Sequence, residues 1–201
     1  MKSINAINIS FLILVFHALK SSAQKLDSVK ISVYYDAAGN ASSDFITQQL
    51  FKSYPAIASR IILELVPWCL GDMLPGSDSY RANVIHTCAF DQTTDEQIHV
   101  DFATCMMNSR VITEENIKKC ADSNGLPYDA IIKCAKGAEG RNKLANNGYK
   151  TKAIYPPIYQ LPAIGNNGWV RAGLQTKAKE NFLGYVCAFL NNPPKECTKK
   201  Q

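Results

Sequence analysis

Apolar and polar residues alternate over residues 29–35, and this period of two predicts a β-strand with one buried face. Apolar residues then recur at helical spacing from Phe45 to Tyr54, so a helix is expected to begin near Ser43 and to stop at Pro55. A second apolar run over residues 60–66 predicts another strand. A strand, a helix and a strand in this order form a crossover, which predicts two parallel strands.

From about Met73 to Lys152 the pattern changes to helical segments separated by turn residues. Helices are expected near residues 100–107, from Thr113 to a stop at 124–125, over 128–136, and over 140–147 with a stop at Asn147-Gly148. Met106 and Met107 are expected to fill the core rather than to form a binding surface. Four cysteines fall in this region, which predicts a helical module stapled by disulfides: Cys88, Cys105, Cys120 and Cys134.

After this module, Pro162 must begin a strand or lie on a sheet edge, because proline cannot donate a hydrogen bond to a ladder. Asn167-Gly168 predicts a hairpin turn before Trp169. Apolar residues from 178 to 190 then recur on one face of an expected last helix, which Pro193-Pro194 would close.

The N-terminus predicts a secretory signal peptide over residues 1–23. Lys2 precedes an apolar run over residues 9–19, and small residues precede an expected cleavage after Ala23. The run is well short of the roughly twenty residues that cross a bilayer, so no transmembrane segment is expected, and residues 24–201 should form a single domain. A secreted, extracellular protein is expected, with the lysosome as the second choice.

A secreted protein folds in an oxidising compartment. Most of the seven cysteines should therefore form structural disulfides. Cys187 and Cys197 bracket the end of the last helix and would clip it. No C-x-x-C occurs in the sequence, and His86 with Cys88 is too isolated a pair to predict a metal site. Neither a metal nor another cofactor is expected. An odd count leaves one thiol over, unpaired or paired between chains.

Several short motifs, in one order over residues 29–197, resemble the gamma-interferon-inducible lysosomal thiol reductase (GILT) family. This resemblance implies an α/β, thioredoxin-like fold with the helical module inserted at about 73–152, and it makes Pro162 a candidate cis-proline. The motifs are Val33-Tyr34-Tyr35, Leu65-Val66-Pro67, Asn83 to Cys88, Cys105-Met106-Met107, Lys119-Cys120-Ala121, Ile132 to Ala135, Gly140, Gly148, Thr151, Pro162 and Asn167-Gly168.

The family's redox motif, C-x-x-C or C-x-x-S, is vacated in this chain. The spacing from Tyr35 to Phe45 places Gly39 on the attacking cysteine and Ser42 on the second position. Glycine has no side chain to form a thiolate, and a serine hydroxyl is not ionised near neutral pH. The resemblance therefore implies a redox-inactive relative.

The family's second signature, C-Q-H-G followed by a cysteine, is also eroded. Met73 and Tyr80 stand where its two cysteines would be, while Gly76 and Asn83 remain. Six family-like cysteines are left for three bridges, of which Cys187–Cys197 is the preferred one, and the pairing inside the module stays open. Cys69 becomes the odd thiol: inert, linking a dimer, or serving as a relocated redox group at the carboxyl edge of the parallel strands.

Two further features bear on partners. Asn40-Ala41-Ser42 is an N-glycosylation sequon inside the vacated turn. The chain's formal charge of +5 falls to +3 without Lys2 and Lys20, which is too mild to imply nucleic acid. Six basic residues against the single acidic Glu139 form either a solvated helix face or a patch for an anionic partner: Lys133, Lys136, Arg141, Lys143, Lys150 and Lys152.

Two functions are therefore expected to compete. The leading hypothesis is a secreted, redox-inactive protein that binds a protein or an anionic surface, such as a glycan or phospholipid head groups. The alternative is a thiol-disulfide oxidoreductase with residual activity through Cys69.

Overall fold

The computed structural model describes residues 28–71 and 73–198, so the predicted signal peptide lies outside the described residues. Its sheet has three strands: β1 (Val29–Tyr35), β2 (Ile61–Pro67) and β3 (Ala163–Asn166), in the order β2-β1-β3. β1 pairs with β2 in parallel and with β3 antiparallel. The predicted parallel crossover is confirmed. The prediction of a single buried face was wrong: β1 is the central strand, so both of its faces are covered beyond Lys30, and even Ser32 is only 3% exposed.

The crossover runs through α2 (Asn40–Asp44), the π-helix η1 (Phe45–Leu50), α3 (Phe51–Ile57) and the 3-10 turn η2 (Ala58–Arg60). Both predicted ends of this helix were wrong. It begins three residues before Ser43, with Gly39 as its N-cap residue and no side-chain cap, and it continues through Pro55 to Ile57. Proline removes one hydrogen bond from the helix, but burial of Tyr54 and Ile57 in the core stabilises the last turn.

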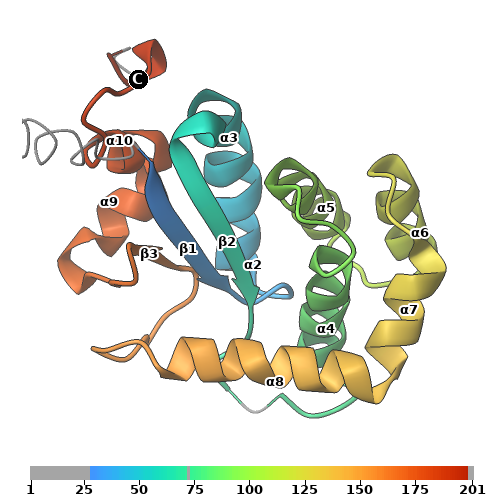
Figure 1. Cartoon of the computed structure of the whole chain (residues 1–201). Coiled ribbons are helices and arrows are strands. Elements are labelled where there is room, and N and C mark those ends of the chain that lie inside the picture. The colour runs from blue at the N-terminus through green and yellow to red at the C-terminus, as the bar shows by residue number, and fades with distance from the viewer. Residues whose placement is uncertain (1–27, 72, 199–201) are drawn as a thin grey trace, which may run out of the picture.

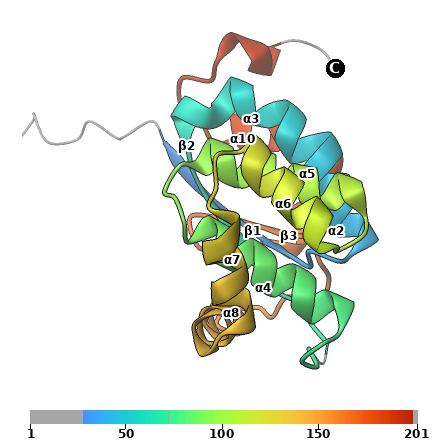
Figure 2. The same cartoon turned by 90° about the vertical axis from the view of Figure 1, so that its right-hand side faces the viewer.

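Five helices form the inserted module: α4 (Asp78–Phe90), α5 (Glu96–Ser109), α6 (Glu114–Ser123), α7 (Tyr128–Lys136) and α8 (Ala138–Lys152). In Figure 1, α4 to α7 lie on one side of the sheet, and α8 runs back beneath it toward β3; Figure 2 shows the same group from its outer side. Ser77, Asp95 and Thr113 accept hydrogen bonds from the first-turn amides of α4, α5 and α6.

α8 is longer than its turn residues predicted. The Asn147 side chain donates to the Pro67 carbonyl and to the Thr87 hydroxyl, at 3.3 and 3.0 Å, instead of ending the helix. Gly148 packs against Trp68, and a Cβ on this glycine would lie 2.6 Å from Trp68 Cη2. Gly148 is thus required for the close approach of α8 to the end of β2, not for a turn.

The C-terminal region contains the 3-10 turn η3 (Ala172–Leu174), α9 (Gln175–Glu180), α10 (Phe182–Cys187) and the 3-10 turn η4 (Lys195–Thr198). The single helix predicted here is divided at Asn181, where the non-helical backbone ends α9 and the side-chain bond from the Gly184 amide begins α10. The hairpin at Asn167-Gly168 is confirmed: both residues have positive φ, 48° and 84°, and Asn166 and Trp169 exchange backbone hydrogen bonds.

Two main cores support this arrangement. One lies between a sheet face and η1, α3, α5, α9 and α10, and it includes Ile31, Val33 and Phe182. The other fills the helical module around Phe102 and Ile117. Met106 and Met107 are 4% and 3% exposed, so the prediction that they belong to the core is confirmed.

Candidate functional site

The candidate site is the turn between β1 and α2, at the edge where β1 and β2 both end. The Trp68 amide, just after β2, donates to the Tyr35 carbonyl at the end of β1 at 2.8 Å. Gly39 stands directly before α2, and Ser42 lies inside it with its side chain buried. The Ser42 hydroxyl accepts a hydrogen bond from the Asp36 amide at 3.2 Å.

The turn is held rigidly by a cluster of side chains from α4. Asn83, which is fully buried, accepts from the Ala37 amide at 3.0 Å and donates to the Asp36 carboxylate at 2.7 Å. The same carboxylate oxygen also accepts from the Ser79 hydroxyl and the Ala38 amide. The turn therefore has a defined shape that does not depend on a disulfide.

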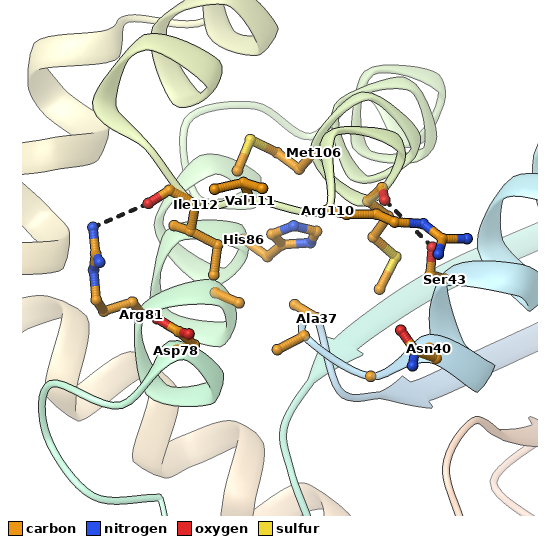
Figure 3. A pocket seen from close by; sticks show the side chains of 14 residues that line it. Ala37, Asn40, Ser43, Asp78, Arg81, His86, Met106, Arg110, Val111 and Ile112 are labelled. Atoms are coloured by element: carbon orange, nitrogen blue, oxygen red, sulfur yellow. Dashed lines mark hydrogen bonds between the residues drawn. The ribbon is translucent and has the colours of Figure 1, made fainter.

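A cavity of about 430 Å³ opens on the module side of this turn (Figure 3). Gly39, Asn40 and Ser43 line it from the turn, His86 from α4, and Met106 and other residues from the end of α5 and the loop after it. Gly39, Asn40 and the helical module thus meet at one hollow. Asn40, the sequon residue, is exposed at its wall.

His86 is the buried polar residue of this cavity. Its Nδ1 lies 2.8 Å from the Tyr35 hydroxyl, and both side chains are almost completely buried. Burial lowers the pKa of His86 to about 3 and raises the pKa of Tyr35 well above its ordinary value. The pair is therefore neutral near pH 7. The sequence predicted no contact between His86 and Tyr35; the occurrence of a histidine within the apolar run of α4 is the signal that could have indicated a buried polar site.

A second hollow, of about 480 Å³, lies on the other side of α2. Ala41, Asp44 and Gln48 line it together with Pro162. Pro162 is buried and follows a cis peptide bond after Leu161, directly before the edge strand β3. The turn between β1 and α2 and the candidate cis-proline are thus neighbours in space although about 120 residues separate them in sequence.

Cys69 is buried and unpaired, with 8% of its surface exposed. Its Sγ lies 3.4 Å from the Gly71 carbonyl oxygen. It follows the end of β2, as expected, but it lines neither of the two hollows beside α2.

The other six cysteines form three bridges within the chain: Cys88–Cys134, Cys105–Cys120 and Cys187–Cys197. The first joins α4 to α7, and the second joins α5 to α6. The third connects the end of α10 to η4. Four cysteines therefore staple the helical module, and two clip the C-terminal segment.

The predicted basic patch is divided by ion pairs. Lys136 pairs with Glu114, Lys143 with Asp91 and Glu139, and Lys150 with Glu64, at 2.7 to 3.5 Å. Lys152 lies 5.9 Å from the centre of the Trp68 ring. Half of the six cations therefore have a carboxylate partner, which weakens any single positive field over α7 and α8.

Within residues 28–71 and 73–198, no cluster of three or more His, Cys, Asp or Glu side chains could hold a metal ion. Over the same residues, no helix has both the length and the apolar character needed to cross a membrane.

Known proteins with similar sequences point to one family. Residues 30–124 match the family model described as "Gamma interferon inducible lysosomal thiol reductase (GILT)". GILT-like protein 1 of Drosophila melanogaster is 25% identical, over 92% of this chain and 85% of that protein. The gamma-interferon-inducible lysosomal thiol reductase of Carassius auratus is 26% identical, over 84% of this chain and 72% of that protein.

Solved structures support the fold. DsbA of Chlamydia trachomatis superposes with a TM-score of 0.58 at 15% identity, covering 82% of this chain and 89% of that one. Oxidised BdbD of Bacillus subtilis gives 0.62 at 12% identity, covering 84% and 90%. At these identities the likeness concerns the fold alone, and it confirms the predicted thioredoxin-like architecture. The family model over residues 30–124 and these relatives support membership of the GILT family.

Proposed function

We propose that this protein is a redox-inactive member of the GILT family that acts by binding. The observation that carries the proposal is Gly39, which stands where the family's attacking sulfur would be. Disulfide exchange requires a thiolate that attacks one sulfur of the substrate while the other leaves, and this turn has none. The nearest hydroxyl, that of Ser42, is engaged with the Asp36 amide.

The surroundings of Gly39 support a site that has the family's geometry but lacks its thiols, rather than a rearranged site. A Cβ on Gly39 would lie 3.5 Å from Ser42 Oγ and 3.3 Å from Asp36 Cβ, which small shifts could accommodate. The turn's hydrogen bonds to Asn83 and the neighbouring cis-proline are in place. Only the thiols are lacking.

The alternative, residual activity through Cys69, has less support. A redox cysteine needs an accessible thiolate and usually a resolving partner. Cys69 is buried, and the remaining six cysteines are paired with one another. Burial also disfavours a disulfide-linked dimer through this residue.

A protein partner fits the surface better than a broad anionic one. The hollow between α2 and Pro162 has a mixed rim of Asp44, Lys179 and Glu180, which suits a peptide or protein surface. Half of the six cations of α7 and α8 are paired with carboxylates. We place the protein outside the cell, or alternatively in the lysosome, after removal of residues 1–23. Sugar at Asn40 would stand over the vacated turn and bar access to it.

A turnover assay with a disulfide substrate and a dithiol tests the proposal. The unmodified protein should show no rate above the uncatalysed reaction, whereas Gly39→Cys with Ser42→Cys should catalyse exchange. Appreciable activity in the unmodified protein that disappears in Cys69→Ser would overturn the proposal in favour of the alternative. A thiol count by mass under non-reducing conditions should give one free thiol per monomer and report sugar on Asn40.

A further inference from the structure

The proposed function leaves one feature unused: the cavity beside His86, which is separate from the hollow at Pro162. Three aromatic rings enclose the His86 imidazole, those of Tyr35, Phe90 and Phe102, with centroids 5.6 to 5.9 Å away. The ring turns toward the cavity between the turn and α5 (Figure 3).

The hydrogen-bond pattern assigns the histidine tautomer. The Tyr35 hydroxyl is buried, and His86 Nδ1 is its partner among the described residues. If Nδ1 carried the hydrogen, the buried phenolic hydrogen would have no acceptor, which would cost about 1–3 kcal/mol. Tyr35 therefore donates to Nδ1, and Nε2 carries the imidazole hydrogen.

Nε2 is then a donor that no described protein atom uses. His86 is 1% exposed, and the space that its ring faces is the cavity that it lines (Figure 3). An unpaired N–H donor at the inner wall of a cavity favours a ligand that carries a hydrogen-bond acceptor.

The other residues that line the cavity indicate which kind of molecule carries this acceptor. Arg81 and Arg110 stand on opposite sides of the cavity against the single acidic Asp78 (Figure 3). Arg110 adopts a left-handed backbone, with φ 54°, at the end of α5, a conformation that is uncommon for a residue with a side chain. The remaining wall is mainly apolar: Ala37, Ala82, Met106, Met107, Val111 and Ile112.

We propose that this cavity binds a small apolar molecule that carries a carboxylate. The carboxylate accepts from His86 Nε2 and pairs with an arginine, and the apolar body packs against the apolar wall at Ala37, Val111 and Ile112. A volume of about 430 Å³ suits a ligand of this size. The site goes beyond the proposed function, since it needs neither a thiol nor a protein partner.

Calorimetric titration of the mature protein with 3-phenylpropionate tests the proposal. We expect saturable binding, and binding weaker by about tenfold for the neutral 3-phenylpropionamide, since the charge-assisted bonds are lost. ¹⁵N-histidine NMR should show the hydrogen on Nε2 of His86, and this signal should shift on binding. Equal affinity for the amide, tighter binding of phenyl phosphate, or no saturation would overturn the proposal.

Substitutions at the cavity distinguish a loss of ligand binding from a loss of folding. His86→Phe should lose binding by about tenfold, and so should Arg110→Gln, at an exposed position, and Arg81→Gln, which also removes the 3.2 Å bond from Arg81 to the Ile112 carbonyl. Lys52→Gln, exposed on α3 away from the cavity, is the matched control and should bind as the unmodified protein does. Unchanged affinity in all three cavity variants would contradict the assignment. Turnover measured in the same samples bears on the proposed function alone, so the two proposals fail separately.

Discussion

The hydroxyl of Tyr35, the last residue of β1, lies 2.8 Å from Nδ1 of His86 on α4. This bond connects the sheet to the inserted module directly behind the turn between β1 and α2. Because both groups are buried, the histidine must remain neutral while the protein is folded. Its titration is therefore linked to stability.

Acid should destabilise the protein through His86. In the unfolded chain the pKa is about 6.5, whereas burial lowers the folded pKa to about 3. Below pH 6.5 the unfolded state binds a proton that the folded state does not, so stability is full above this pH and falls as the pH drops toward 3. Between pH 7 and pH 5 the loss is about 2 kcal/mol.

Urea unfolding at the two pH values measures this loss. His86→Gln keeps an acceptor for Tyr35 but has no titrating group, so its stability should fall by about 2 kcal/mol less than that of the unmodified protein. An identical pH response in the two proteins would show that His86 is not a buried neutral group.

The contact between Gly148 and Trp68 should tolerate no added methyl group. The Cβ of Gly148→Ala would lie 2.6 Å from the indole, so α8 would have to move from the end of β2. We expect a loss of about 1–3 kcal/mol in the free energy of unfolding. Gly173→Ala is the matched control, since its Cβ would meet nothing within 4 Å. Equal stability of the two variants would refute the packing argument.

Asn83 should be the residue that keeps the vacated turn rigid. Asn83→Ala removes the acceptor of the Ala37 amide and one donor to the Asp36 carboxylate. A loss of about 1–3 kcal/mol is expected for these buried groups. Hydrogen exchange of the Ala37 and Ala38 amides should become faster. The exposed Asn146→Ala serves as control, and unchanged exchange in Asn83→Ala would show that the turn is held by other contacts.

The disulfides should differ in their contribution to stability because they close loops of different length. Cys88–Cys134 spans 46 residues and Cys187–Cys197 spans 10. The loop-closure relation gives about 4 and about 2.7 kcal/mol for the two bridges. Paired replacement by alanine, followed by thermal unfolding, should lower the midpoint more for the first pair. The reverse order would indicate that loop closure does not dominate.

The sequence predicted the elements whose signals are local. The alternating residues 29–35, the turn at Asn167-Gly168 and the Thr113 cap all occur as expected, because each depends on neighbours within a few residues. Family spacing also placed Gly39 and Ser42 at the turn between β1 and α2.

Tertiary contacts decided where local signals conflicted with packing. Pro55 and Asn147-Gly148 are stop signals in isolation, yet both helices continue because burial against the sheet and against Trp68 outweighs a lost hydrogen bond or a flexible residue. The basic patch was divided by carboxylates distant in sequence, such as Glu64 beside Lys150.

For the site itself, the sequence alone determined that the turn after β1 carries no thiol, because that depends only on which residues stand at 39 and 42. Only the tertiary structure brought His86 onto Tyr35 and opened its ring to a cavity, because a histidine in an apolar helix segment can equally be a sealed core residue. Long-range packing, which no local pattern encodes, decided between these two environments.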